Sequence, residues 1–325
     1  MSAEEYTMFA KMLSDPAITD LRKLHYKYPD ADMPAFTAYL KERVYREVPL
    51  PDFHGGHLVY LDPAAVVPAE TAKLPEQQGS PADGLPAAGE EIAASLAIEG
   101  IRTSRENVRH IFAGSAPRNA AEAKIRDMKL GLDFIADPAH KITEENIHRL
   151  YEIAIARQLD AEDRLLPGRR YRHGAVYVAG DRLAHTGLPY AKLPAYMARL
   201  AAFIQESSGM DALVKAAVIH FYVAFLHPYF DGNGRMARLL HLWYLVQSGA
   251  PSALPLPFST RIRASQSAYY KAYTLVEKNA RISGVLDVTP FLVYFGKAVY
   301  PPAELQASSQ QEGKENTPPP ELSLL

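Results

Sequence analysis

The run HPYFDGNGRMAR, residues 227–238, contains the residue types that bind and transfer phosphate groups. Pro228 disfavours a helical conformation at His227, so the apolar helix before it is expected to end there. Gly232 and Gly234 permit backbone conformations that other residues resist, and a second apolar helix follows them. The free N–H groups at the start of such a helix favour an anion, and a phosphate fits best.

The charged residues of the same run fit a polyphosphate ligand. Arg235 and Arg238 are three residues apart, which places both on one side of the second helix near its start. Two neighbouring guanidinium groups repel each other unless an anion lies between them. Asp231 adds a hard oxygen ligand suited to Mg²⁺, which phosphates would bind at the same time. His227 is then placed to act as a general base beside the phosphate.

Other ligand-binding motifs fit this run poorly. Gly232, Gly234 and Ala237 match a dinucleotide-binding fingerprint, but no strand precedes them. A calcium loop that began at Asp231 would need Glu at its twelfth position, where Leu242 stands. The remaining alternative is a glycine-rich helix connection with arginines on a solvated face, and the complete run of His, Pro, Asp, Gly and Arg disfavours it.

Helices must hold this run in place. One helix is expected over 210–226 and another over 235–248, on either side of the run. Upstream, Thr103 and Glu106 fit a capping box that begins a further helix. The one convincing strand pattern, over 168–185, predicts a small β-hairpin within a helical protein.

The run closely resembles the signature of the Fic (filamentation induced by cAMP) family, His-Pro-Phe-x-Asp-Gly-Asn-Gly-Arg-x-x-Arg, with Tyr229 in place of the usual Phe. The resemblance extends over about residues 90–300. Fic proteins are mainly α-helical, and most transfer AMP from ATP to a Ser, Thr or Tyr hydroxyl of a target protein. The resemblance therefore implies an all-α fold, with a helical Fic core, one small β-hairpin flap and an N-terminal helical extension.

The resemblance also implies a role for each residue of the run. His227 would take the proton from the attacking hydroxyl, and Asp231 would hold Mg²⁺ between the α- and β-phosphates of ATP. Arg235 and Arg238 would neutralise the β- and γ-phosphates, which suits a reaction driven by positioning and charge neutralisation. The other ATP-binding positions in the run are Gly232, Asn233, Gly234, Met236 and Ala237.

The hairpin predicted within 168–185 resembles the flap of the family, which aligns the target chain by main-chain pairing. Its turns are expected at His173-Gly174 and at Gly180-Asp181. Four flap residues are expected to line the site: Val176, Tyr177, Val178 and Ala179.

Residues outside the run and the flap are weaker candidates. Tyr269 and Asn279 resemble adenosine-side positions of the family, although core packing explains Tyr269 equally well. Arg169, Arg170 and Arg172 form a basic cluster at the base of the flap. A solvated surface is the first interpretation of that cluster, and docking of the target is the second.

SLAIEG, residues 95–100, matches the inhibitory pattern of the family, Ser/Thr-x-x-x-Glu-Gly/Asn. Glu99 would lie in the last turn of a helix, where a carboxylate opposes the helix dipole unless a cation pairs with it. Arg238 would be that cation, so that Ser95, Glu99 and Gly100 form an inhibitory segment in the same chain. The alternative is a plain amphipathic helix that ends with Gly100 at its C′ position.

Length and composition limit the organisation of the chain. Its 325 residues, 48% of them hydrophobic, suffice for one large domain or two modest ones. Changes in composition predict four parts: an N-terminal helical extension (1–62), a Pro-rich linker or surface wrap (63–89), a Fic domain with its inhibitory helix (90–300) and a disordered tail (301–325).

Charge and cysteine content exclude several classes of protein. The 35 Lys and Arg residues against 37 Asp and Glu residues exclude an overall basic nucleic-acid binder. The absence of Cys excludes disulfides, thiolate metal sites and Cys nucleophiles. No signal peptide and no membrane span are expected, so the expected location is cytoplasmic.

The favoured function is Mg²⁺-dependent transfer of AMP from ATP to a target protein, inhibited by Glu99. The alternatives are removal of AMP by the same site, with Glu99 orienting a water, and a nucleotide-sensing switch protein without turnover. Transfer of phosphate or phosphocholine has no support in the run. The target protein cannot be identified from the sequence; self-modification, with Tyr171 as one acceptor, and a homodimer both stay open.

Overall fold

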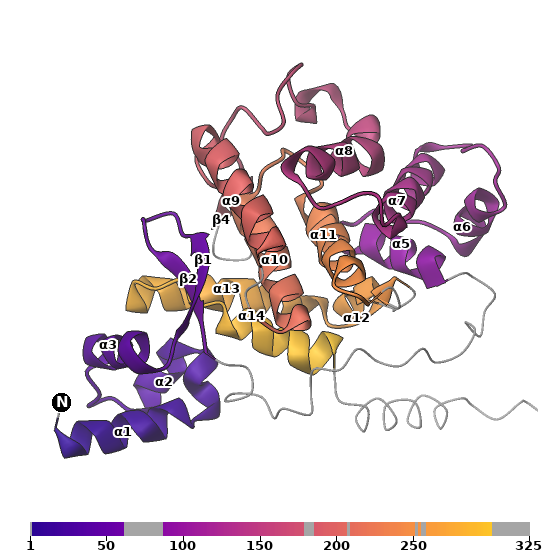
Figure 1. Ribbon diagram of the computed structural model, residues 1–325. Coiled ribbons are helices and arrows are strands. Elements are labelled where there is room, and N and C mark those ends of the chain that lie inside the picture. Colours follow the sequence, from indigo (N-terminus) through magenta and orange to yellow (C-terminus); the bar gives the residue numbers. More distant parts are fainter. Residues whose placement is uncertain are drawn as a thin grey trace, which may run out of the picture.

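Figure 1 shows the computed structural model of the protein, which describes residues 2–61, 87–178, 185–206, 209–250, 253–254 and 258–300. This part of the chain is mainly helical, which confirms the predicted fold class. None of its helices combines the length and the apolar character that crossing a membrane requires. The tail 301–325 and most of the predicted linker lie outside the described residues, and the last three linker residues belong to helix α5.

The α-helices are, in chain order, α1 (Ala3–Leu13), α2 (Leu21–Lys27), α3 (Met33–Arg43), α5 (Ala87–Ile98), α6 (Arg105–Phe112), α7 (Ala120–Ala136), α8 (Glu144–Ala154), α9 (Leu193–Gln205), α10 (Ala212–Leu226), α11 (Asn233–Gln247), α12 (Phe258–Ala264), α13 (Gln266–Ser283) and α14 (Thr289–Tyr294). The strands are β1 (Arg46–Pro51), β2 (His57–Tyr60), β3 (Tyr177–Val178) and β4 (His185–Thr186). Short helical turns include η1 (Pro16–Thr19), η3 (Ala156–Gln158) and the π-helical turn η7 (Phe295–Val299).

Helices α10 and α11 form the centre of the main core and run side by side in Figure 1. Asp211 starts α10, because its Oδ1 accepts hydrogen bonds from the amides of Leu213 (2.9 Å) and Val214 (3.2 Å). Both helices are buried on nearly every side. The loop that joins them, residues 227–232, is therefore held at both ends by the packed core.

Helix α5 packs against α7 and α12, and one buried carboxylate anchors it. Glu91 is buried, and its side chain accepts hydrogen bonds from the backbone amide of Ser259 (2.6 Å) and from the Ser259 hydroxyl. These bonds also satisfy an amide in the first turn of α12, which would otherwise have no helical partner. The carboxylate therefore fixes the position of α5 relative to α12.

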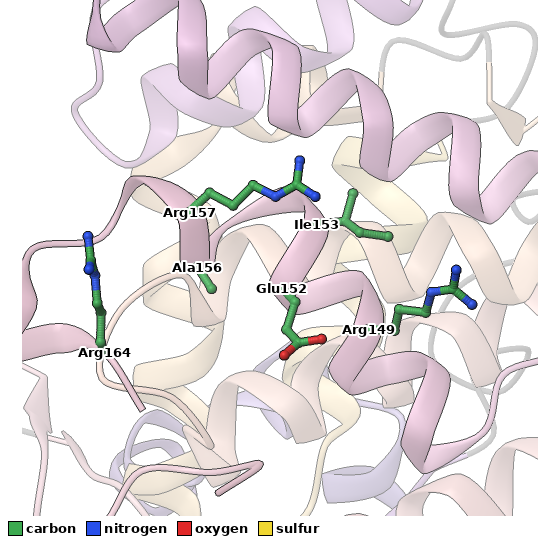
Figure 2. A pocket seen from close by; sticks show the side chains of 6 residues that line it. All are labelled: Arg149, Glu152, Ile153, Ala156, Arg157 and Arg164. Atoms are coloured by element: carbon green, nitrogen blue, oxygen red, sulfur yellow. The ribbon is translucent and has the colours of Figure 1, made fainter. Parts of the chain in front are cut away.

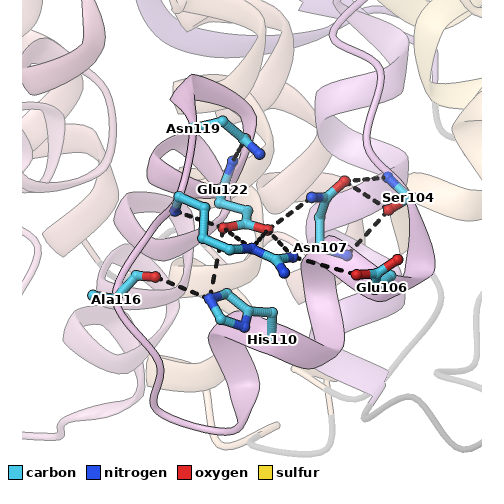
Figure 3. Close-up of polar contacts among 8 residues, drawn as sticks. Ser104, Glu106, Asn107, His110, Ala116, Asn119 and Glu122 are labelled. Atoms are coloured by element: carbon cyan, nitrogen blue, oxygen red, sulfur yellow. Dashed lines mark hydrogen bonds and ion pairs between the residues drawn. The ribbon is translucent and has the colours of Figure 1, made fainter.

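Figure 3 shows a second buried carboxylate, Glu122, which ties α6 to α7. It accepts hydrogen bonds from Asn107 Nδ2 (2.8 Å) and Arg118 Nη2 (2.6 Å), and the bond from Arg118 lowers the pKa of Glu122 to about 2. Ser104 caps α6: its side chain accepts a hydrogen bond from the amide of Asn107, and the Asn107 side chain accepts one from the amide of Ser104. The predicted capping box, with Thr103 as its cap, is thus displaced by one residue.

The N-terminal region has a small core of its own, formed by α1, α2 and α3 around Phe9 and Phe36. The predicted helical extension ends at Arg43, because β1 and β2 then form an antiparallel hairpin that the sequence did not reveal. Pro49 and Pro51 obscure its alternating pattern, since proline is confined to the edges of sheets. The structure therefore contains a second antiparallel pair besides the predicted flap.

The β1–β2 hairpin docks directly on the main core. The carbonyl of Pro49 accepts a hydrogen bond from Arg199 Nε (2.8 Å), and that of Pro51 accepts one from the Tyr222 hydroxyl (2.8 Å). At the tip of the hairpin, the ring of Phe53 stacks on Phe225, with 4.0 Å between the ring centroids. The N-terminal region thus reaches the end of α10, next to the loop that carries the motif.

Candidate active site

His227 ends α10 in a left-handed backbone conformation, with φ 54° and ψ 61°. It is the only residue other than glycine with a positive φ among the described residues. Such a conformation is unfavourable for a residue with a Cβ, so the surrounding structure must enforce it. Its amide still donates to the carbonyl of Val223 (3.0 Å), which completes the last turn of the helix.

Arg172 holds His227 in this conformation through hydrogen bonds to three carbonyl groups. Its Nε donates to the carbonyl of His227 (2.7 Å), its Nη1 to that of Gly174 (2.6 Å), and its Nη2 to that of Leu188. The side chain is buried, so the expectation of a solvated surface is wrong for this arginine. No local pattern distinguishes Arg172 from Arg169 or Arg170, because its partners come from distant parts of the chain.

The imidazole of His227 is prepared to act as a base. Its Nδ1 lies 3.3 Å from the carbonyl of Ala224, which can only accept, so Nδ1 carries the proton and Nε2 keeps a free lone pair. Burial lowers the pKa of His227 to about 4, and the nearby His185 and Arg172 push it in the same direction. The ring is therefore neutral near pH 7.

The loop after His227 is braced by one asparagine and one aromatic stack. Asn233 accepts from the amide of Tyr229 (2.9 Å) and donates to the carbonyl of Tyr229 (2.8 Å). The ring of Tyr229 stacks on Tyr151, with centroids 3.7 Å apart. The Tyr229 hydroxyl has no hydrogen-bond partner among the described residues. The aromatic packing is nevertheless kept.

The N-terminus of α11 is open to an anion. Gly232 is its N-cap, with φ 86°, and no side chain caps the helix. Only glycine fits this position, because a Cβ there would overlap the side chain of Ile155. Asp231 accepts from the Gly232 amide (2.5 Å) and leaves the amides of the first turn of α11 unused.

Two buried guanidinium groups face this helix start. Arg235 Nη2 lies 2.8 Å from Asp231 Oδ2, while Arg238 Nη2 lies 2.6 Å from Glu99 Oε1. Both arginines are buried, yet Arg235 Nε and Arg238 Nη1 have no hydrogen-bond partner among the described residues. Buried donors without partners are costly, and an anionic ligand would satisfy them.

Glu99 already brings a carboxylate to this place. Arg238 binds the segment through three contacts: Nε to Ser95 Oγ (2.8 Å), Nη2 to the Ser95 carbonyl (3.0 Å) and Nη2 to Glu99 Oε1. Gly100 then turns the chain with φ 74°. A Cβ at position 234 would overlap Glu99 Oε1, so Gly234 lets the carboxylate approach the first turn of α11. The predicted pairing of Glu99 with Arg238 is thus present.

The predicted flap is present as the strand pair β3–β4, in which Tyr177 pairs with Thr186 and Val178 with His185. Tyr177 is 73% exposed, so this strand is accessible to another chain. Val176 lies just before β3, and its carbonyl accepts from the amide of Gly187 (3.3 Å). Ala179 lies outside the described residues.

His185, on β4, is a site residue that the sequence did not indicate. Its ring centroid lies 6.4 Å from that of His227. Its Nε2 is 2.8 Å from the carbonyl of Phe225, and its Nδ1 is 2.5 Å from Glu277 Oε1. A lone histidine in a strand carries no motif, so only its position beside His227 reveals it.

His185 also lines a cleft of about 490 Å³. The cleft lies between the flap strand β4, helix α13 with Glu277 and Arg281, and the hairpin tip with Phe53. Its volume is in the range of small-molecule sites. The structure therefore places the uncapped start of α11, a neutral histidine and a cleft near one another.

Four of the predicted ligand positions have other roles in the structure. Met236 and Ala237 are buried on the core side of α11, so their side chains do not face the helix start. Tyr269 is buried and its hydroxyl lies 2.8 Å from His220 Nε2, as expected from core packing. Asn279 accepts from the amide of Leu21 (3.0 Å) and donates to the carbonyl of Thr19 (3.1 Å), which attaches the N-terminal region to α13.

Comparison with known proteins relates these features to one family. The model of the Fic/DOC family matches residues 141–245, which include the strand pair β3–β4, α10 and most of α11 with the run 227–238. The chain is 32% identical over 93 residues to protein adenylyltransferase fic-1 of Caenorhabditis briggsae, a match that covers 29% of this chain and 16% of the relative. It is 27% identical over 214 residues to protein adenylyltransferase Fic of Drosophila ananassae, which covers 62% of this chain and 38% of the relative.

A solved structure is similar as well. The crystal structure of a Fic family protein from Desulfovibrio desulfuricans G20 matches with a TM-score of 0.57 and 26% identity, over 69% of this chain and 66% of that one. The curated relatives are matched over less than half of their lengths. The comparisons therefore concern the domain that contains the site.

Proposed function

Because residues 141–245 form a Fic/DOC family domain, we propose that this protein transfers AMP from ATP to a Ser, Thr or Tyr hydroxyl of a target protein with the help of Mg²⁺. The observation that carries the proposal is the pair of buried donors without partners, Arg235 Nε and Arg238 Nη1, beside the uncapped start of α11. A polyphosphate satisfies both donors and the free amides at once. His227 Nε2, which keeps a free lone pair, would act as the general base.

The reaction follows from these positions. His227 Nε2 takes the proton of the target hydroxyl, whose oxygen forms a bond to the α-phosphorus of ATP while the bond from that phosphorus to the β-phosphate oxygen breaks. Pyrophosphate leaves with the negative charge that Arg235 and Arg238 stabilise, and His227 then releases its proton to solvent. The exposed strand at Tyr177 would hold the target chain by main-chain pairing.

Asp231 is the residue of this chain that would hold the metal. Its carboxylate is 50% exposed, and one carboxylate together with substrate phosphates is the usual binding mode of Mg²⁺. The described residues contain no group of three or more His, Asp or Glu side chains that would bind a metal without the nucleotide. When bound, Mg²⁺ would neutralise phosphate charge.

The cleft of about 490 Å³ is the place we assign to the adenosine. It adjoins His227 through His185, and its wall includes the Phe53–Phe225 stack, on which a planar base can pack. Glu277 and Arg281 supply polar groups at its edge. This assignment replaces Tyr269 and Asn279, whose polar groups already have partners.

The resting protein is inhibited in this proposal. The carboxylate of Glu99 occupies the start of α11 and pairs with Arg238, which a γ-phosphate would otherwise use. ATP then binds with its triphosphate turned away from the position needed for attack. Displacement by about one ångström suffices to slow a reaction about 10²-fold.

Removal of AMP is the second candidate function, and one observation favours it. The Glu99 side chain is 29% exposed, so a water molecule can reach the carboxylate while it remains close to the helix start. A carboxylate in that place could orient water toward the phosphorus of an AMP-modified hydroxyl. In this case Glu99 would be required for the reaction.

Transfer of radiolabel tests the proposal. Purified protein incubated with Mg²⁺ should label itself from [α-³²P]ATP and not from [γ-³²P]ATP, and the Glu99→Gly variant should take up more label. The His227→Ala variant is the control for enzymatic transfer. Label from the γ-position would show phosphate transfer instead. If the Glu99→Gly variant binds ATP and labels nothing, the protein is a nucleotide-sensing switch.

A further inference from the structure

A groove with three arginines lies on the outer face of α8 and the turn η3, outside the site described above. It is an open surface depression of about 720 Å³, lined by Arg149, Glu152, Ile153, Ala156, Arg157 and Arg164. Figure 2 shows Arg164 and Arg149 at opposite ends of it, with Ile153 and Ala156 between them. The groove therefore has an apolar floor with cationic ends.

The positive charge of this groove is not neutralised within the described part of the chain. No carboxylate there lies within ion-pair distance of Arg149, Arg157 or Arg164; the guanidinium of Arg149 lies over the Phe134 ring, and Arg164 Nε donates to the carbonyl of Leu159 (3.1 Å). The one acidic residue of the lining, Glu152, has His148 as its neighbour at 3.5 Å. Three positive groups against one negative group leave a net charge of about +2.

We propose that this groove binds an acidic segment of a protein partner, in which carboxylates flank an apolar side chain. The carboxylates would pair with Arg157 and Arg164, and the apolar side chain would cover Ile153 and Ala156. A nucleic acid fits less well, because the whole chain carries a net charge of -2 and a pI of about 6.6.

The position of the groove connects it with the site. Ile155, between the groove residues Ile153 and Ala156, packs where a Cβ of Gly232 would lie, and Tyr151 on the inner face of α8 stacks on Tyr229. The same segment of the chain continues to the flap strand β3. A target held by the groove would therefore lie close to the strand that presents its hydroxyl, a role that rests on the proposed function, whereas the binding itself does not.

Direct binding tests the groove. The probe is a fluorescent peptide with the core Glu-Glu-Leu-Glu-Glu, and its matched controls carry Gln for every Glu or Gly for Leu. We expect fluorescence anisotropy to show binding of the first peptide to the full-length chain. The double variant Arg157→Glu/Arg164→Glu should weaken it by about tenfold or more, because attraction becomes repulsion. The double variant Arg22→Glu/Lys23→Glu, which makes the same change in charge at exposed positions of α2, should leave it unchanged.

Three results would overturn the proposal. They are equal binding of the Gln peptide, unchanged binding by the double variant, and an RNA oligonucleotide that displaces the peptide and binds more tightly through the same arginines. Should the double variant unfold, Arg157→Gln/Arg164→Gln provides the same comparison with a smaller expected effect. Self-modification by a Glu99→Gly variant that also carries the Arg157 and Arg164 substitutions separates the two proposals. Because self-modification needs the active site and not the groove, it should persist even when the peptide no longer binds.

Discussion

Replacing Glu99 with Gly is the most informative perturbation of the site. The carboxylate oxygen Oε1 lies 2.6 Å from Arg238 Nη2 and covers the first turn of α11. A γ-phosphate bound by Arg238 would therefore lie within about 4 Å of the carboxylate, where two like charges repel by about 4 kcal/mol at an effective dielectric constant of about 20. The Glu99 side chain is 29% exposed, and screening by solvent reduces this repulsion to about 3 kcal/mol.

A repulsion of that size predicts a large gain in activity. Removal of about 3 kcal/mol corresponds to an increase in the rate of AMP transfer on the order of 10²-fold. The variant should remain folded, because Arg238 keeps its bonds to Ser95 and because Glu99 follows the last residue of α5. The assay is self-modification followed by intact mass, with one added AMP as the product.

Matched variants separate charge from size. Glu99→Gln keeps the length of the side chain and loses its charge, so it should gain part of the rate. Glu90→Gln makes the same change in the first turn of the same helix and should leave the rate unchanged. Equal rates for Glu99→Gly and wild type would refute the inhibitory role. If wild type removes AMP from a modified target and Glu99→Gly does not, Glu99 orients a water and AMP removal is the function.

Three further predictions concern the base, the metal and a buried acid. His227→Ala should lower the rate of AMP transfer by about 10²–10⁴-fold, while calorimetry still shows ATP binding. Because burial holds the pKa of His227 at about 4, the rate of wild type should stay constant as the pH falls through 6.5, and a decline near pH 6.5 would contradict a buried neutral base. Asp231→Ala should lose the dependence of ATP binding on Mg²⁺, measured with and without chelator, and equal transfer in chelator would exclude a metal at this residue. Burial raises the pKa of Glu91 from 4.5 to about 7, so between these pH values the folded state binds more protons than the unfolded state, and the free energy of unfolding should fall as the pH rises, by about 3 kcal/mol in total. Glu91→Gln should remove this pH dependence in urea titrations, and an unchanged pH dependence would show that Glu91 does not cause it.

The run 227–238 could be recognised in the sequence because its structural requirements are local. Gly232 and Gly234 are needed for close approach by neighbouring groups, and Pro228 ends the helix at His227. Arg235 and Arg238 share one side of α11 through helical spacing alone. The fold class follows in the same way, since apolar periodicity identifies helices one at a time. Predicting that Glu99 pairs with Arg238 also required the resemblance of residues 95–100 to the inhibitory pattern of the family.

Local sequence patterns could not predict contacts between segments that are far apart in the chain. Arg172 holds His227 in its left-handed conformation, and the side chain of Asn279 bonds to the N-terminal region. Neither role can be predicted from the neighbouring sequence. The tip of the β1–β2 hairpin reaches the cleft with Asp52, Phe53 and His54, and Phe53 stacks there on Phe225. Residues separated by 55 to 260 positions in the chain make these hydrogen bonds. Burial and partner geometry, which arise when helices pack, decide whether a polar side chain binds a ligand or the protein itself.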